Sequence, residues 1–300
     1  HWTVQPLGAG LSNGYTGVAL FLAELGALTG AARYVDFARD AVRPLPALLE
    51  MFGAMPELVA AAGGGFHGLG GICYALARLT PLLGLDPGLL ATAVSLMPLE
   101  DRSFSVVDGV AGSLAAMIAV GTPESLALAE HYAAVLPGSI CSANGFARGH
   151  AGIGWALRRY AATVPNESSS VAATFSVAAE SCFEADVIDP TDAGWCSGVS
   201  GAALARSDDR LGAALLSREP LRDMSLCHGE LGVIEALSTH HPAAAARRTA
   251  LLLGALDEHG ARCATPGGVP SPGLLTGLAG IGHGLLRQGF PVSSVLLFEP

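Results

Sequence analysis

Apolar residues are distributed along this chain in two alternating kinds of segment. One kind is almost wholly apolar, as in residues 18–22 and 153–157, and each such run follows a short turn that contains glycine. A helix that is apolar on all sides is buried on all sides. The other kind mixes apolar and charged residues at helical spacing, as in residues 31–50, 126–136 and 243–256. The pattern therefore predicts buried helices that alternate with half-exposed ones.

The turn has the form x-Gly-x-x-Gly and recurs seven times. Its first glycines are 54, 41, 40, 49, 31 and 48 residues apart, which leaves room for two helices in most repeats. A supersecondary unit that recurs at such spacing indicates a repeat architecture, and closing the repeats into a ring removes the need for capping repeats. We therefore predict one all-α domain over residues 1–300, with seven inner and seven outer helices in two concentric rings. The residues directly before the first glycines are Asn13, His67, Asp108, Arg148, Ser197, His228 and Thr276.

These turn-leading residues should surround a common mouth, because the seven inner helices would all begin at the same end. Asn13, Asp108, Ser197 and Thr276 are residue types favoured as helix N-caps. Backbone N–H groups and helix dipoles at this end favour negative charge, including that of a thiolate. We therefore expect the functional side chains to gather at this mouth.

A thiol and an imidazole stand side by side in the sixth turn, at Cys227 and His228. A second thiol, Cys196, has the equivalent place in the fifth turn. Consecutive side chains diverge inside a helix, but at a helix start both can reach one ion. Three N and S ligands with one open position are typical of catalytic zinc, so the pattern predicts a zinc site of these three residues. The competing interpretation is a core role, since cysteine is often buried, and we adopt it for Cys73 and Cys182.

Composition narrows the possible classes of function. Hydrophobic residues make up 51% of the chain and charged residues 14%, against about 25% charged in typical domains, which favours one compact body. The formal net charge is −10 and no cluster of Lys and Arg stands out, so we expect no nucleic-acid partner and no membrane partner. Six cysteines are too few for a disulfide framework, and no signal peptide is visible, so we expect free thiols in the cytoplasm. Glycine, proline or charge interrupts every long apolar run within about 18 residues, so no membrane span is predicted.

Four motifs resemble those of the lanthionine synthetase C-like cyclases, zinc enzymes that close thioether rings in lanthipeptides. The motifs are residues 14–22 (GYTGVALFL), 65–71 (GFHGLGG), 145–154 (GFARGHAGIG) and 273–282 (GLLTGLAGIG). The resemblance covers essentially the whole chain and implies an α/α toroid that binds Zn2+ through Cys196, Cys227 and His228. It also implies a dehydrated precursor peptide as substrate.

The C-terminal residues 294–300 (SVLLFEP) resemble the end of class II synthetases, in which a dehydratase domain lies upstream of the cyclase. The resemblance therefore implies an upstream or separate dehydratase domain as a partner. The chain begins with His1 rather than Met, which suits a cyclase domain cut from such a protein.

The reaction that the resemblance implies is the addition of a peptide thiolate to dehydroalanine or dehydrobutyrine. Zinc would generate and hold the thiolate, and the enolate that forms would be protonated at its α-carbon. Arg148 could stabilise the enolate by its charge. Either His150 or His67 could deliver the proton, and we prefer His150 because it shares the fourth turn. Asp108, the acidic turn-leading residue, completes the set of candidate catalytic residues.

Two positions depart from the family pattern. Arg148 stands where the family usually has His, and Ser105 stands where it usually has Asp. The family residues are assigned acid–base or positioning roles, which Arg and Ser cannot perform in the same way. An alternative hypothesis is therefore a zinc-containing peptide-binding module without catalytic activity. A toroidal glycosidase would need two opposed carboxylates, and Asp108 is the only acidic residue among the turn leaders.

Overall fold

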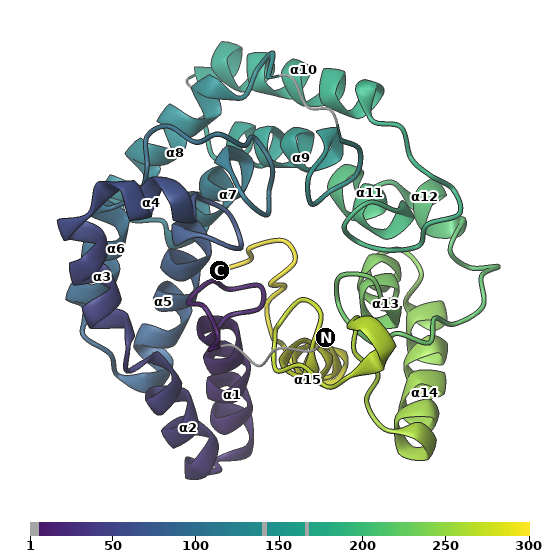
Figure 1. Cartoon of the computed structure of the whole chain (residues 1–300). Coiled ribbons are helices and arrows are strands. Elements are labelled where there is room, and N and C mark those ends of the chain that lie inside the picture. The colour runs from purple at the N-terminus through teal and green to yellow at the C-terminus, as the bar shows by residue number, and fades with distance from the viewer. Residues whose placement is uncertain (1–5, 140–142, 166–167) are drawn as a thin grey trace.

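The computed structural model describes residues 6–139, 143–165 and 168–300, and this part of the chain forms helices and loops without a strand. An inner ring of helices surrounds the centre of the molecule (Figure 1). Each inner helix contacts the next one along the chain, and the last contacts the first, so the ring is closed. The inner helices are α1 (Tyr15–Thr29), α5 (Leu69–Leu83), α7 (Val110–Val120), α9 (His150–Ala161), α11 (Val199–Arg206), α13 (Glu230–Ser238) and α15 (Leu278–Gly289). Each follows one of the seven glycine turns, and the predicted α/α toroid is confirmed.

The outer helices pack on the inner ring and are less regular than predicted. They are α2 (Ala32–Val42), α3 (Leu45–Ala54), α4 (Pro56–Ala62), α6 (Pro87–Ser95), α8 (Pro123–Val135), α10 (Ser169–Ala185), α12 (Asp209–Ala213) and α14 (Pro242–His259), and a short 3-10 turn, η2 (Pro266–Gly268), follows α14. Three outer helices lie between α1 and α5, α12 has only 5 residues, and no described helix follows α15. Residues 31–50, predicted as one helix, divide into α2 and α3 at Pro44, because proline lacks an N–H and clashes with the preceding turn.

The seven turns are joined by backbone hydrogen bonds that run once around the ring. The N–H of each turn donates to a carbonyl of the next turn, and the seventh turn donates to the first. These bonds are Ser12 to Phe66 (3.3 Å), His67 to Val107 (2.9 Å), Val107 to Ala147 (3.0 Å), Ala147 to Cys196 (2.9 Å), Trp195 to Cys227 (2.8 Å), Cys227 to Leu275 (3.0 Å) and Leu275 to Ser12 (2.8 Å). The turns therefore hold one another in register, and the two cysteines of the predicted zinc site belong to this set of bonds.

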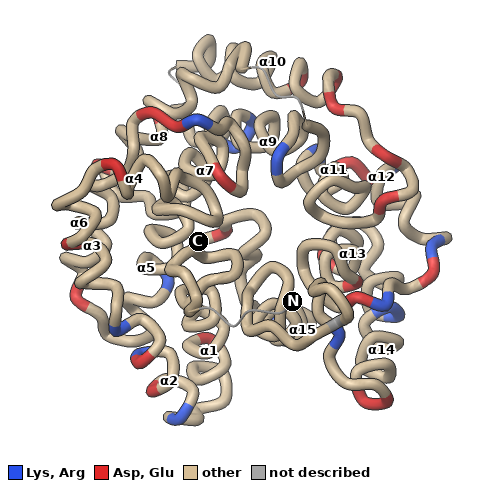
Figure 2. Tube along the Cα trace, viewed as in Figure 1, with Lys and Arg blue, Asp and Glu red and all other residues tan. Residues whose placement is uncertain are grey.

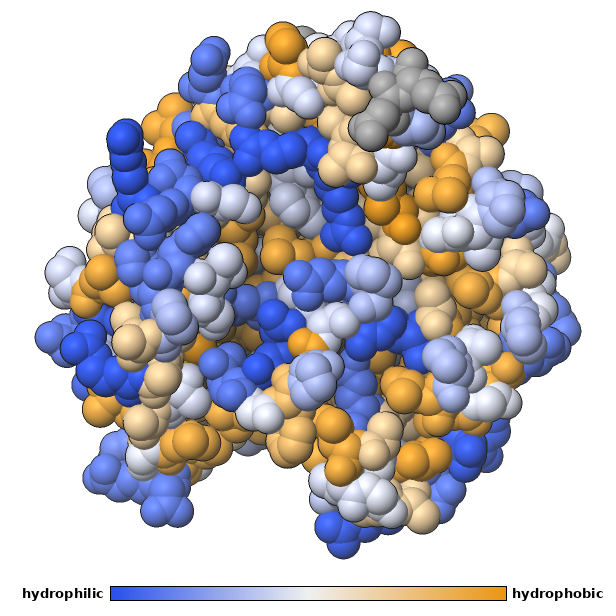
Figure 3. Space-filling model, turned by 180° about the vertical axis from the view of Figure 1, so that it is seen from behind, coloured by the Kyte–Doolittle hydropathy of each residue, from blue (hydrophilic) through white to orange (hydrophobic). Residues whose placement is uncertain are grey.

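The C-terminal segment, residues 290–300, runs into the centre of the inner ring (Figure 1). Phe298 is fully buried, and its ring centroid lies 4.3 Å from that of Phe66. Arg159 of α9 donates to the Phe298 carbonyl at 2.7 Å, and Arg78 of α5 donates to the Glu299 carbonyl at 3.1 Å. Figure 3 shows this side of the molecule, where hydrophilic residues gather around the centre of the ring. The tail therefore fills the side of the ring opposite the turns.

Lys and Arg residues are scattered over both rings and their loops (Figure 2). No single described helix has both the length and the apolarity to cross a bilayer. Among the described helices, only the pair formed by residues 32–54 and α4 meets both conditions together, and that pair is bent by 114°.

The first glycine of each turn, and not the residue before it, is the N-cap of each inner helix, and its helix receives no side-chain cap. The prediction that Asn13, Asp108, Ser197 and Thr276 are N-caps is therefore wrong. These residues lie one position outside the helix, where a side chain can turn toward the mouth instead of the helix N–H groups. Side-chain caps occur in the outer ring, where Thr122 accepts the Ser125 N–H at the start of α8.

We expect Thr122→Ala to lower the free energy of unfolding by about 1 kcal/mol, because it removes a side-chain N-cap. Ser168→Ala is the matched control, since Ser168 is the N-cap residue of α10 but makes no side-chain cap. Urea unfolding followed by circular dichroism measures both. An equal loss in the two variants would show that the Thr122 cap does not stabilise α8.

Candidate metal centre

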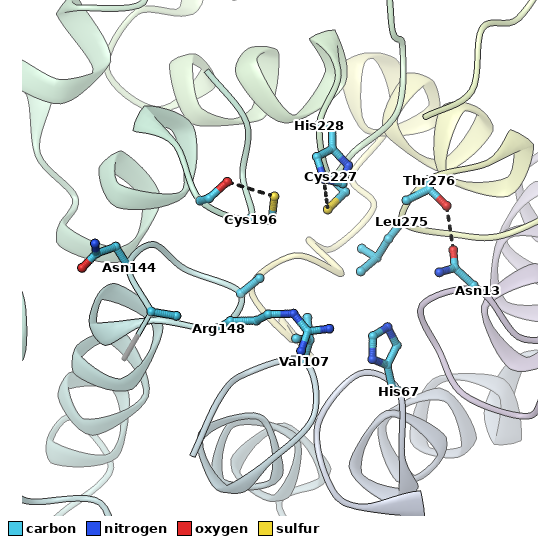
Figure 4. A pocket seen from close by; sticks show the side chains of 13 residues that line it. Asn13, His67, Val107, Asn144, Arg148, Cys196, Cys227, His228, Leu275 and Thr276 are labelled. Atoms are coloured by element: carbon cyan, nitrogen blue, oxygen red, sulfur yellow. Dashed lines mark hydrogen bonds between the residues drawn. The ribbon is translucent and has the colours of Figure 1, made fainter. Parts of the chain in front are cut away.

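A cavity of about 410 Å³ opens at the end of the inner ring where the turns meet (Figure 4). The described residues that line it are Asn13, His67, Val107, Ala143, Asn144, Ala147, Arg148, Cys196, Ser197, Cys227, His228, Leu275 and Thr276. Six of the seven turn-leading residues are among them, and Asp108 is the exception. The fold therefore gathers the turn-leading side chains around one mouth, as their positions in the repeats predict.

The two thiols and the imidazole of the predicted zinc site lie together on one wall of this cavity. The ligand atoms of Cys196, Cys227 and His228 all lie within 4.8 Å of one another. Cys227 Sγ lies 3.9 Å from His228 Nε2, and a tetrahedral zinc ion with ordinary bond lengths would place such atoms about 3.6 Å apart. The spacing and the donor types both fit zinc, and Figure 4 shows the three side chains facing the cavity. A fourth position would thus be open to a ligand in the cavity.

The same local structure places both thiols. In the fifth turn Asp192 Oδ1 accepts the Gly194 N–H at 2.7 Å, and in the sixth turn Asp223 Oδ1 accepts the Ser225 N–H at 2.8 Å. Each aspartate stands four residues before its cysteine. The Asp-x-x-x-Cys spacing was thus a visible signal for these supporting residues, which sequence reasoning missed.

Asp192 also reaches Cys196 of the candidate metal cluster through Ser197. The Ser197 hydroxyl donates to Asp192 Oδ2 at 2.6 Å, and Ser197 Oγ lies 3.4 Å from Cys196 Sγ. Hydrogen bonds of this kind fix the orientation of a metal-binding side chain. Asp192 and Ser197 therefore support Cys196.

The side chains of Cys196, Cys227 and His228 perturb one another. The hydrogen bond with Cys227 lowers the pKa of the Cys196 thiol to about 4, and His228 adds to this effect. The same hydrogen bond, together with burial, raises the pKa of Cys227, and the hydrogen bond with Cys196 raises the pKa of His228. The cluster therefore holds a thiolate at neutral pH, which is the form of cysteine that binds metal ions.

A second polar cluster lies across the cavity from the thiols (Figure 4). Asp108 holds two side chains from the neighbouring turns: its Oδ1 lies 2.6 Å from His67 Nδ1, and its Oδ2 accepts a hydrogen bond from Arg148 Nη1. His67 and Asp108 are about one-third exposed, and Arg148 is mostly exposed. Three of the four candidate catalytic residues are therefore in one contact network.

The fourth candidate, His150, is placed differently. It is the first residue of α9 and is not among the residues that line the cavity. Its Nδ1 atom is buried without a hydrogen-bond partner in the described part of the chain. Ser105 is also buried, and its hydroxyl accepts the Asp108 N–H at 3.0 Å, so it orders the third turn instead of facing the mouth.

Among the described cysteines, Cys73, Cys196, Cys227 and Cys263 carry free thiols. Cys73 is buried in the core, as expected, whereas Cys182 on α10 is only partly buried. The two cysteines of the zinc prediction thus differ from these by facing a shared cavity.

Comparisons with known proteins agree with this architecture. A family model described as lanthionine synthetase C-like protein matches residues 5–296. The fold is similar to that of a solved structure named nisin cyclase, with a TM-score of 0.67, 18% sequence identity, and coverage of 97% of this chain and 92% of that chain. No protein with a curated description matches the chain.

Proposed function

The chain belongs to the lanthionine synthetase C-like family, and from this premise we propose that it is a zinc-dependent peptide cyclase that forms lanthionine or methyllanthionine rings. The observation that carries the proposal is the cluster of Cys196, Cys227 and His228, which offers two sulfurs and one nitrogen on the wall of a cavity. Three ligands with an open side are the donor set of a catalytic zinc site, whereas structural zinc sites have four protein ligands.

A zinc ion held by these three residues would lower the pKa of a peptide thiol and keep its sulfur at the cavity wall. The cavity is large enough for a peptide side chain and a short stretch of backbone, and its wall carries polar groups from several turns. Its residues would therefore bind the substrate between the metal wall and the wall that carries His67 and Arg148.

The reaction is an addition without change in overall oxidation state. The substrate sulfur forms a bond to the β-carbon of dehydroalanine or dehydrobutyrine, and the C=C electron pair moves to the adjacent carbonyl as an enolate. The thiol has lost one proton, and the α-carbon gains one. Arg148 stands on the wall opposite the thiols, where its guanidinium would stabilise the enolate oxygen. A histidine would supply the proton to the α-carbon.

The substrate that fits this chemistry is a precursor peptide with both cysteine and dehydrated serine or threonine residues. A dehydratase must act before the cyclase, because unmodified serine and threonine have no C=C bond to accept a thiolate. We propose an upstream or separate dehydratase domain as the source of this peptide, and a cytoplasmic site of action.

The alternative is a peptide-binding module that retains zinc without catalysing ring closure. The observation in its favour is that Arg148 and Ser105 stand where the family usually has acid–base residues, and that Ser105 is buried away from the cavity. The contact between His67 and Asp108 favours the enzyme, because it supplies an acid–base pair from other turns. None of the described residues that line the cavity is Asp or Glu, so the glycosidase hypothesis has no support.

A synthetic peptide with one cysteine and one dehydroalanine tests the proposal. We expect the purified, zinc-loaded chain to consume the peptide thiol at least about tenfold faster than the uncatalysed addition, with one thioether formed for each thiol lost by mass spectrometry. The same peptide added to cobalt-substituted protein should increase the thiolate-to-cobalt absorption. A cobalt response without faster thiol loss would support the binding module and contradict the cyclase.

A further inference from the structure

We infer that His67 is the proton donor of this chain and that Asp108 is its positioning residue, an inference that rests on the proposed cyclase function. From the sequence, His150 in the fourth turn is the preferred proton donor, whereas this inference assigns that role to His67 in the second turn. Three observations carry it: the contact between His67 and Asp108, the anchoring of both residues, and the side of the cavity that His67 occupies.

The contact fixes which ring nitrogen of His67 can act. Asp108 Oδ1 lies 2.6 Å from His67 Nδ1, and an ionised carboxylate only accepts hydrogen bonds, so Nδ1 carries a hydrogen. The other ring nitrogen, Nε2, is then the one that can exchange a proton with substrate. Figure 4 shows the His67 ring projecting into the cavity on the side opposite Cys227 and His228.

Both partners of the contact are anchored by the backbone. The His67 N–H donates to the Val107 carbonyl at 2.9 Å, directly beside Asp108 in the chain. The Asp108 N–H donates to Ser105 Oγ at 3.0 Å. The serine that replaces the usual family aspartate thus holds the residue that orients the histidine. A side chain fixed in this way loses little freedom when it reaches the transition state.

Arg148 shares the same carboxylate, since its Nη1 donates to Asp108 Oδ2. One acidic residue therefore sets an imidazole and a guanidinium side by side on the wall that faces the thiols. In the proposed step His67 Nε2 gives its proton to the α-carbon while the Arg148 guanidinium faces the enolate oxygen. The imidazole leaves the step neutral, and it regains a proton from solvent or from the next substrate thiol. No redox partner is required.

His150 lacks these features. It does not line the cavity, and its Nδ1 atom is buried without a hydrogen-bond partner in the described chain. A proton donor needs to come within hydrogen-bond reach of the reacting atom. The geometry therefore assigns the proton transfer to His67.

The test is ring closure of the cysteine–dehydroalanine peptide by His67→Ala, with and without added imidazole. General acids contribute about 10²–10⁴-fold to rate, so we expect kcat to fall by at least about 100-fold. Added imidazole should restore at least about tenfold of the loss, because it replaces the missing acid, whereas it cannot repair a folding defect. Zinc content should match wild type. His259→Ala, a change of an exposed histidine at the end of α14, is the matched control.

Asp108→Asn tests the positioning role. The amide can still contact both neighbours but can present its N–H toward His67, so we expect kcat to fall about tenfold while KM stays within about twofold. Asp36→Asn, on the exposed face of α2, is the control.

Wild-type activity combined with a rate for His67→Ala within about threefold of wild type would overturn the inference and leave the proposed function standing. Loss in His67→Ala that imidazole does not restore, with the thermal midpoint lowered, would also overturn it, by showing a structural role. Absence of wild-type cyclisation, by contrast, would reject the proposed function itself.

Discussion

Cys227→Ala is expected to abolish both zinc binding and ring closure. Cys227 is the most deeply buried of the three proposed ligands, with 7% of its surface exposed, and its backbone is hydrogen-bonded to turns on both sides. Without its sulfur, Cys196 and His228 would be left as two ligands on an open wall, and two ligands rarely retain zinc against water. We expect zinc to fall below about a tenth of one equivalent per chain, measured by elemental analysis after gel filtration. Thiol loss in the peptide assay should fall to the uncatalysed rate.

Cys182→Ala is the matched control for the cysteine change. Cys182 lies on α10 in the outer ring, outside the metal cluster, and its removal should leave zinc content and rate unchanged. Circular dichroism of Cys227→Ala should show the helical content of wild type, because the turn is also held by backbone bonds. Full zinc content in Cys227→Ala would contradict the ligand assignment and with it the proposed centre.

The repeat and the clustering of Cys196, Cys227 and His228 could be predicted because both depend on local sequence. Each Gly-x-x-Gly turn is visible in the chain, and an apolar run after each turn is enough to indicate a buried helix. Cys196, Cys227 and His228 could be brought together because equivalent positions of neighbouring repeats meet in a closed ring. Residues at equivalent positions of neighbouring repeats are therefore close in space although they are far apart in the sequence.

The contacts across turns could not be predicted in the same way. His67, Asp108 and Arg148 each occupy the same place in their own turn, so the repeat gives no reason to choose the pair that His67 and Asp108 form. The choice depends on side-chain lengths and on how far adjacent turns are rotated. The tail that fills the ring was also missed, because residues 290–300 belong to no repeat and carry no helical pattern.

The other large expected effect is a loss of stability in Gly201→Ala, which changes the second glycine of the fifth turn. A Cβ atom added at Gly201 would lie 1.9 Å from the carbonyl oxygen of Trp195 and 2.8 Å from Phe146 Cβ. Neither neighbour can give way easily, because one is backbone and both residues are fully buried. Overpacking of a tight core site costs about 1–3 kcal/mol and sometimes more. We expect a value at the upper end of this range, about 3 kcal/mol, by urea unfolding.

The same substitution should also weaken the proposed metal site, because the clash falls on the residue that positions both thiols. Trp195 directly precedes Cys196, and its N–H donates to the Cys227 carbonyl at 2.8 Å. A shift of this peptide would separate the two sulfurs, so zinc affinity should fall by at least about tenfold, as measured by competition with a chromogenic chelator.

Gly254→Ala is the control variant, which distinguishes the effect at Gly201 from the effect of replacing any glycine by alanine. Gly254 lies within α14, where an added Cβ would meet nothing within 4 Å. There alanine should raise stability by about 0.5–1 kcal/mol, since it restricts the unfolded chain and favours the helix. Equal stability changes in the two variants would show that the second glycine is not required for packing. In that case, close packing of helix and turn at Gly201 would not be what holds the two thiols in place.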